Sequence, residues 1–240
     1  MEKFLLGFDP LYFAQGLEKS IYWNPDSACH MLIVGASGSG KTYCSKQILG
    51  NIVYFSRKVK LYVANYKGDT DFSFLDGCHD YYSFSDCCKA VNTVYERLLN
   101  RQSHEDPTRN LIILYFDEYT SFLNNLEKKE AEKYKTKIAT LLMLGRSFRI
   151  HILISIQRAD ASQFCNGARD NFGVVIGLGN LSQEAKQMLF SEYKEQMKNH
   201  HGRGCGYMTT NGTDFCEILV PPIKDWDKLH DYVRQGVENT

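Results

Sequence analysis

Five short apolar runs recur along the chain, and each has the length of one β-strand. They are His30–Gly35, Val59–Asn65, Leu111–Asp117, Ile150–Gln157 and Gly173–Leu178. Runs that are apolar on both faces are typical of parallel strands covered by helices on both sides. Between them, apolar positions repeat at helical spacing. The predicted helices are 41–49, 85–101, 126–145 and Ser182–Phe190. Strands that alternate with helices predict an α/β domain of three layers.

The C-terminal part of the chain carries a different pattern. Gly204–Val220 contains two strand-like stretches around Asn211-Gly212, a pair that favours the tight turn of an antiparallel hairpin. Pro221-Pro222 then interrupts the chain, and an amphipathic helix is predicted after it. Its apolar positions are Trp226, Leu229, Tyr232 and Val233. We therefore expect a short extension over 1–27, one main domain over 28–222 and a helix over 223–240.

Composition excludes several classes of protein. The 240 residues are 43% hydrophobic and 23% charged, which suits one sizeable globular domain. The 28 basic and 28 acidic side chains cancel, so the chain lacks the basic excess of a protein that coats nucleic acid. No apolar run approaches the roughly 20 residues of a membrane helix. Any contact with nucleic acid must come from local loops, an assembled ring or a partner.

The cysteines point to a reducing compartment. The eight cysteines include no CxxC pair, and the N-terminus lacks the apolar stretch of a secretory signal. We therefore expect reduced, mostly buried thiols in a cytoplasmic protein. His200, His201 and Cys205 lie close in sequence, but their spacing fits no common zinc pattern, so we expect no zinc site.

A phosphate-binding pattern follows the first apolar run. Gly35–Thr42 fits G-x-x-x-x-G-K-[ST], and the strand before it and helix after it disfavour a glycine-rich turn without a ligand. Glycines let backbone N–H groups face one anion, and the helix adds its positive N-terminal end. We expect Lys41 to reach the β- and γ-phosphates and Thr42 to bind Mg²⁺. The predicted ATP-binding residues are Gly35, Ala36, Ser37, Gly38, Ser39, Gly40, Lys41, Thr42 and Tyr43.

Two acids follow one another at the end of the third run. Such a strand places Asp117 and Glu118 at the carboxyl edge of the sheet, where ligands bind in open α/β folds, although charge can also simply end a strand at the surface. We expect Asp117 to hold Mg²⁺ through its water shell and Glu118 to polarise the attacking water as general base. Gln157 ends the next run, where its amide either senses the γ-phosphate or is merely solvated.

Several arginines flank the fourth and fifth runs. They are Arg146, Arg149, Arg158 and Arg169. Any of them could act as an arginine finger across a subunit interface, where it would stabilise transition-state charge, while a surface role is the alternative for each. Our predicted catalytic set is Lys41, Glu118, Gln157 and Arg169.

Taken in order, these segments resemble the FtsK/SpoIIIE/HerA group of DNA-pumping ATPases, including the coupling ATPases of conjugation elements. The segments that resemble its signatures are His30–Gly35, Asn65–Asp69, Tyr95–Arg101, Gly145–Arg158 and Gly202–Met208. The resemblance covers about 28–222, most of the chain. Four positions depart from the usual pattern, which suggests a divergent member. They are Ser37 for threonine, Asn65 for an acid, Arg149 for glycine and Cys205 for aspartate.

The resemblance implies a three-layer RecA-like P-loop NTPase with a central, mostly parallel sheet and a C-terminal β-hairpin. It also implies an ATP-driven translocase of a mobile element or phage, with ATP and Mg²⁺ as cofactors and double-stranded DNA in the channel of a hexameric ring. Six converging copies of a few basic loops would offset the zero net charge. The mixed run 127–137 could line such a channel, but a solvated face held by i,i+4 ion pairs is favoured.

Two other functions remain open. One is a virion-assembly or secretion ATPase that works at a membrane with a membrane-bound partner. The other is a non-motor ATP-dependent switch that recruits replication or segregation proteins. Glu118 disfavours the switch, because a protein that only binds ATP gains little from a hydrolytic base.

Overall fold

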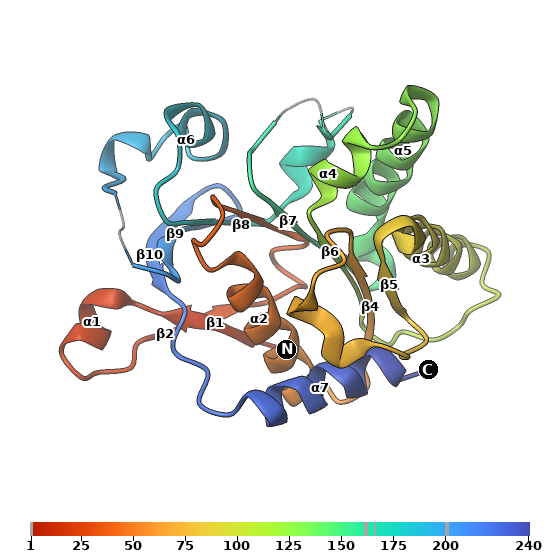
Figure 1. The fold of residues 1–240 in the computed structure, drawn as a ribbon, viewed down its shortest axis with the longest axis horizontal. Coiled ribbons are helices and arrows are strands. Elements are labelled where there is room, and N and C mark those ends of the chain that lie inside the picture. Colours follow the sequence, from red (N-terminus) through yellow and green to blue (C-terminus); the bar gives the residue numbers. More distant parts are fainter. Residues whose placement is uncertain (1, 161–162, 166, 200–201) are drawn as a thin grey trace.

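The strands form one sheet in the computed structural model, which describes residues 2–160, 163–165, 167–199 and 202–240. They are β1 (Phe4–Phe8), β2 (Ser20–Trp23), β3 (Met31–Val34), β4 (Lys60–Asn65), β5 (Tyr81–Ser83), β6 (Ile112–Asp117), β7 (Ile150–Ile156), β8 (Val174–Leu178), β9 (Cys205–Thr210) and β10 (Asp214–Leu219). The ten-stranded order among these residues is β2-β1-β10-β9-β8-β3-β7-β6-β4-β5 (Figure 1).

The sheet has a parallel and an antiparallel part. From β8 to β5 the neighbouring strands run parallel, as the doubly apolar runs predicted. From β2 to β9, and where β9 meets β8, the pairs are antiparallel. All five predicted strands are present as β3, β4, β6, β7 and β8. The predicted α/β fold, with its mostly parallel central sheet, is therefore confirmed.

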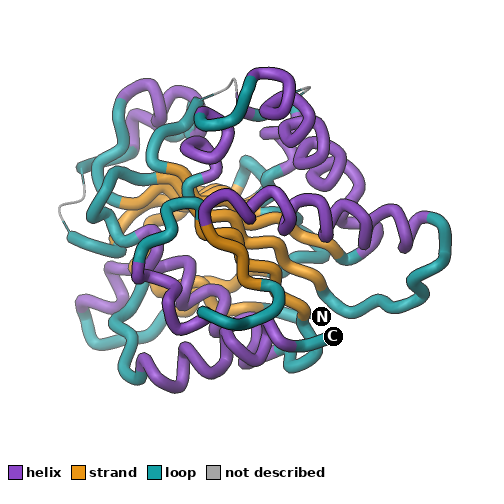
Figure 2. Tube along the Cα trace, turned by 45° about the vertical axis from the view of Figure 1, so that its right-hand side comes forward, coloured by secondary structure: helices purple, strands orange, loops and turns teal. Residues whose placement is uncertain are grey.

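Helices cover both faces of this sheet (Figures 1 and 2). They are α1 (Pro10–Ala14), α2 (Lys41–Phe55), α3 (Cys87–Gln102), α4 (Tyr119–Asn124), α5 (Lys128–Leu144), α6 (Gln183–Leu189) and α7 (Trp226–Glu238). Short 3₁₀ turns are η1 (Thr70–Leu75), η2 (Phe84–Asp86), η3 (Gly145–Phe148), η5 (Ala168–Asn171) and η6 (Lys194–Gln196).

The strand period of two divides the core into two layers. In β3, Leu32 and Val34 pack into the core with α3, α4 and α5, while Met31 and Ile33 face α2 and α7. Because β3 is buried on both faces, it carries the phosphate loop on a rigid central strand. No helix within the described residues is both long and apolar enough to cross a membrane.

The hairpin near the C-terminus was predicted and is confirmed. β9 and β10 pair in register from Thr210–Asp214 to Cys205–Leu219. Asn211 and Gly212 have φ values of 52° and 73°, and the Thr213 N–H donates to the Thr210 carbonyl at 3.2 Å. A left-handed backbone at both positions is what the Asn-Gly pair tolerates at low cost.

Three details differ from the expectations. Residues 1–27 contribute β1 and β2 to the same sheet, through pairing of β1 with β10; the boundaries at 27 and 222 remain predictions. Helix 41–49 extends to Phe55. All eight thiols are free, as expected, but only Cys44 and Cys87 are buried, so the prediction of mostly buried thiols was wrong.

Candidate active site

The phosphate loop lies between β3 and α2, and its backbone requires glycine. Gly40, at the start of α2, has φ 101°, a region that favours glycine. A Cβ on Gly40 would lie 2.9 Å from the backbone nitrogen of Gly204. The Gly204 N–H in turn donates to the Ser39 carbonyl at 2.9 Å. The loop therefore folds against the 202–204 segment, and the sequence places no larger residue at this contact.

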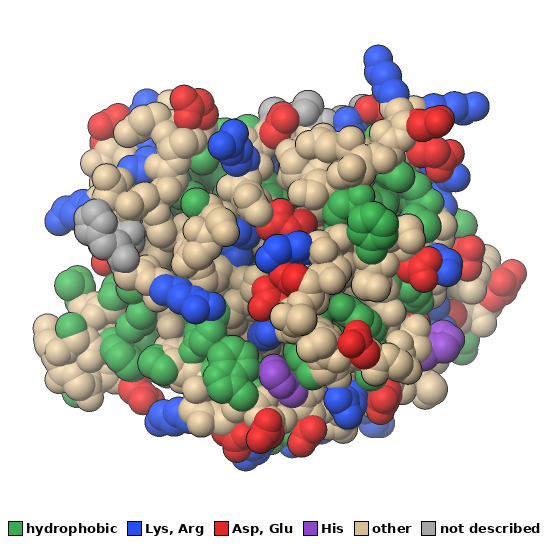
Figure 3. Space-filling view, in the orientation of Figure 1, with side chains coloured by type: hydrophobic (Ala, Val, Ile, Leu, Met, Phe, Trp, Pro, Cys, Tyr) green, Lys and Arg blue, Asp and Glu red, His purple; other side chains and the backbone are tan. Residues whose placement is uncertain are grey.

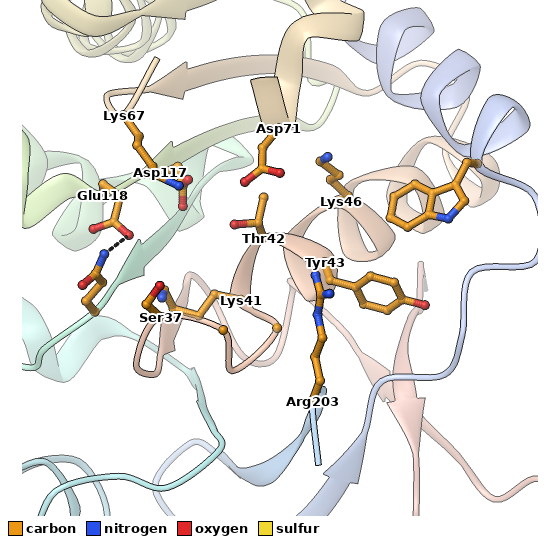
Figure 4. Close-up of a pocket in the computed structure, with 14 residues that line it drawn as sticks. Ser37, Lys41, Thr42, Tyr43, Lys46, Lys67, Asp71, Asp117, Glu118 and Arg203 are labelled. Atoms are coloured by element: carbon orange, nitrogen blue, oxygen red, sulfur yellow. Dashed lines mark hydrogen bonds between the residues drawn. The ribbon is translucent and has the colours of Figure 1, made fainter. Parts of the chain in front are cut away.

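Three of the four predicted catalytic residues, Lys41, Glu118 and Gln157, meet because of the strand order. β7 lies between β3 and β6, so all three strands end at the same edge of the sheet. One pocket is lined by Lys41 at the start of α2, Asp117 at the end of β6, Glu118 directly after it, and Gln157 after β7 (Figure 4). Figure 3 shows acidic and basic side chains gathered together at the centre of this face of the molecule.

Asp117 is a buried carboxyl group with few compensating contacts. It is 3% exposed, and the hydroxyl of Tyr115 donates to its Oδ1 at 2.9 Å. Burial, with a smaller contribution from the neighbouring Glu118, raises the pKa of Asp117 from 3.8 to about 6. Tyr115, Ser155 and Lys41 act in the opposite direction. Such a group gains from a nearby cation. Burial also lowers the pKa of Lys41, while Glu118 and Asp117 raise it.

The donor set fits the predicted magnesium ion. The Thr42 hydroxyl and the Asp117 carboxylate line the same pocket, and Mg²⁺ prefers oxygen ligands of this kind. His200 and His201, considered above for zinc, lie outside the described residues. Among the residues that are described, no group of three or more His, Cys, Asp or Glu side chains could hold a metal ion. Mg²⁺ at Thr42 and Asp117 stays a prediction.

Glu118 has a strained backbone and a fixed side chain. Its φ and ψ are 56° and 44°, a left-handed conformation that costs a non-glycine residue about 1–3 kcal/mol. The Gln157 Nε2 donates to the Glu118 Oε1 at 3.0 Å (Figure 4). Gln157 is therefore part of the site rather than only a solvated strand end. Its sensor role and the general-base role of Glu118 remain predictions.

Arg169 lies away from these residues in the same chain. It belongs to η5 and lines a second pocket with Arg146 and Gly173, at the amino ends of the parallel strands. The phosphate loop lies at the carboxyl ends, so Arg169 does not line the pocket of its own chain. A surface role and the predicted action across a subunit interface are both compatible with this place, and the action across an interface remains a prediction.

Two buried histidines, from two of the segments that resemble the family, support the fold and not the nucleotide pocket. His30 and His151 are buried with their rings 5.5 Å apart, and the His30 Nδ1 accepts from the Ile152 N–H at 3.0 Å. Burial lowers the pKa of His30 to about 4. His30 lies just before β3, at the end remote from the phosphate loop, so it supports the central strands and does not line the nucleotide pocket.

Sequence reasoning missed several residues that line the pocket. They are Lys46, Lys67, Asp71, Arg203 and Trp226. Lys67 and Arg203 lie in segments that resemble the family, which was the available signal. Trp226 carried no such signal, because α7 is brought to the pocket by long-range packing on α2, β4 and η1. Tyr43 was predicted to bind nucleotide; its ring lines the pocket and its hydroxyl donates to the Pro221 carbonyl at 2.9 Å.

Comparison with known proteins places this site in a family. Residues 12–157 match the FtsK/SpoIIIE family. The chain belongs to the FtsK/SpoIIIE family. It is 27% identical over 241 residues to the FtsK domain-containing protein YdcQ of Bacillus subtilis, covering 92% of this chain and 50% of YdcQ. The chain thus spans about half the length of this FtsK/SpoIIIE relative.

Solved structures of FtsK/SpoIIIE-like ATPases share the fold. The pCW3 conjugation coupling protein TcpA matches with a TM-score of 0.70 and 18% identity, over 90% of this chain and 65% of TcpA. The cytoplasmic domain of the type VII secretion ATPase EccC of Thermomonospora curvata matches with a TM-score of 0.72 and 16% identity, over 98% of this chain and 31% of that domain. These structures confirm the predicted fold, and the family match confirms the predicted P-loop ATPase class.

Proposed function

We propose that this chain is the ATP-hydrolysing domain of a double-stranded DNA translocase that works as a hexameric ring. The observation that carries the proposal is the hydrogen bond from Gln157 to Glu118, beside Lys41 and Asp117 in one pocket. Lys41 holds the β- and γ-phosphates, and Gln157 orients the Glu118 carboxylate toward the attacking water. Thr42 and Asp117 would hold Mg²⁺, which would neutralise charge on the phosphates when bound.

Two observations support action in a ring. Arg169 lies at the amino edge of the parallel strands, opposite the phosphate loop, so head-to-tail copies would place it near the nucleotide of the neighbouring copy. The zero net charge also fits a protein whose few basic loops form a positive DNA-binding surface only when several copies assemble. The family match and the likeness to the conjugation coupling protein TcpA support the proposal of DNA as the cargo.

The run 127–137 supports the solvated alternative rather than a channel lining. Lys133 pairs with Glu130 at 3.2 Å and Lys135 with Glu132 at 2.8 Å, both at i,i+3 spacing. Lys137 donates to the side chain of Asn92 at 2.6 Å. Because several lysines of the run already have local partners, we assign DNA contact to other loops of the ring.

The test measures ATP hydrolysis and particle size with and without long duplex DNA. We expect duplex DNA to raise the rate and ATP to promote hexamers, and Lys41→Ala to abolish turnover. Lys128→Ala, at the solvent-facing start of α5, is the matched control and should keep the wild-type rate. A rate that no DNA changes, from a protein that stays monomeric with ATP, would contradict the translocase.

A membrane-associated assembly or secretion ATPase is the second candidate, because EccC shares the fold. In that case hydrolysis should respond to a membrane-bound protein partner and ignore free DNA, in the same assay. A recruitment switch would bind ATP as a monomer with negligible hydrolysis. The contact between Gln157 and Glu118 argues against a switch, because it orients a base that only hydrolysis uses.

A further inference from the structure

The nucleotide pocket continues beyond the phosphate loop. From Lys41 and Thr42 it extends past Tyr43 and Lys46, on the first turns of α2 (Figure 4). Trp226, at the start of α7, lies against both Tyr43 and Lys46 and also lines the pocket. Glu118 lies at the opposite end of the pocket from Lys46 (Figure 4), and Gln157 is hydrogen-bonded to it. A nucleotide whose γ-phosphate faces Glu118 must therefore direct its sugar and base toward the Trp226 end.

Aromatic rings line this second end. The rings of Tyr43 and Trp226 lie 5.5 Å apart at 75°, and the Arg203 guanidinium lies 5.5 Å from the Tyr43 ring. Trp226 remains 38% exposed although α7 packs on α2. An indole that borders a polar pocket with part of its surface open offers a surface on which a base can stack.

A buried ammonium group gives independent support for an anionic ligand here. Lys46 is 7% exposed, and its Nζ lies 5.2 Å from the Phe72 ring, 5.6 Å from Phe74 and 5.6 Å from Trp226. Within the described part of the chain, no carboxylate oxygen lies within 4.0 Å of this Nζ. A buried cation gains from an opposite charge, and Lys46 lines the pocket.

We propose that Trp226 stacks on the base of the bound nucleoside triphosphate, with Tyr43 and Arg203 bordering the sugar and Lys46 meeting the α-phosphate. This assignment rests on the proposed function, because it takes ATP as the ligand. It makes α7 part of the nucleotide site, since Trp226 is the first residue of that helix. Binding of the nucleotide would therefore be felt directly by α7, the helix that packs along α2.

The chain offers an intrinsic probe for this proposal. Its two tryptophans are Trp23 and Trp226, and Trp23 is 1% exposed and lines no part of the pocket. The experiment titrates the protein with MgATP and with magnesium tripolyphosphate, and follows tryptophan fluorescence and calorimetric heat. ATP should quench the fluorescence, whereas tripolyphosphate, which has no base, should bind without quenching. Trp226→Phe should lose the quench but keep ATP affinity within about threefold, because phenylalanine still stacks.

Trp226→Ala should weaken ATP binding about tenfold and leave tripolyphosphate binding unchanged, because one base–aromatic contact is removed. The matched control is Tyr232→Ala, which removes an aromatic ring of the same helix that lies outside the pocket and contacts Tyr54. It should bind both ligands as the wild type does.

The outcomes separate this inference from the proposed function. If ATP binds but does not quench the fluorescence, or if Trp226→Ala binds ATP as tightly as the wild type, the base does not stack on Trp226 and the inference is wrong. If calorimetry detects neither ATP nor tripolyphosphate binding to the wild type, the proposed ATPase function itself is wrong. Loss of tripolyphosphate binding in Trp226→Ala would mean that the pocket has collapsed in that variant. Trp226→Phe then decides: loss of the quench with ATP affinity retained supports stacking on Trp226, whereas a quench that persists contradicts it.

Discussion

Replacing Asp117 by asparagine should stabilise the protein that is free of nucleotide and metal, and abolish its ATP turnover. Asp117 is 3% exposed, and burial raises its pKa to about 6. The folded state therefore binds this proton more tightly than the unfolded state does. The free energy of unfolding of the wild type is therefore highest at low pH, where Asp117 is protonated, and it falls as the pH rises from about 4 through about 6. The neutral amide of the variant has no charge to bury, so it avoids this loss.

The size of the effect follows from the shift of the pKa. A change from 3.8 to about 6 corresponds to about 3 kcal/mol of free energy, at about 1.4 kcal/mol for each pKa unit. About 2 kcal/mol of that difference develops between pH 4.5 and pH 7.5. In a domain of this length it would raise the melting temperature of Asp117→Asn over the wild type by about 4–8 °C.

The assay compares urea and thermal unfolding of both proteins at pH 4.5 and pH 7.5 in the presence of a chelator. Asp76→Asn, at an exposed position outside the pocket, is the control and should show no pH-dependent gain. A stability difference between wild type and Asp117→Asn that is the same at both pH values would refute the reasoning. A variant that is less stable than the wild type at pH 7.5 would refute it as well.

Three further changes test other parts of the site. Glu118→Gln should retain ATP binding and slow single-turnover hydrolysis by about 10²–10⁴-fold, and a wild-type rate would exclude it as the base. Arg169→Ala should be inactive alone but regain ATPase activity when mixed with Lys41→Ala, because each copy supplies what its neighbour lacks; no recovery would argue against a trans finger. Gly40→Ala should lower the melting temperature and weaken ATP binding, since the added Cβ would meet backbone at 2.9 Å. Gly77→Ala, at φ 86° with open space around it, controls for backbone strain alone and should cost less in the same thermal scan.

The strands and the phosphate loop could be read from the sequence because their signals are local. Each doubly apolar run became a buried strand of the parallel part, and Asn211-Gly212 became the hairpin turn. The loop 35–42 needs glycines whatever surrounds it, since their backbone geometry depends on the missing side chain. Among the described strands, β1, β2 and β5 were not predicted, because they lie at or next to the edges of the sheet, are short and carry weaker patterns.

The site as a whole depended on long-range packing. The sequence placed Asp117 and Gln157 at strand ends, but only the order β3-β7-β6 brings Gln157 to Glu118. The same sheet places Arg169 at the amino ends of the parallel strands, away from the phosphate loop. Packing of α7 on α2 brings Trp226 beside Tyr43. Periodicity along the chain determines which face of a helix or strand is buried. Which other elements that face packs against depends on how the whole chain buries its apolar surface, and the local sequence does not show this.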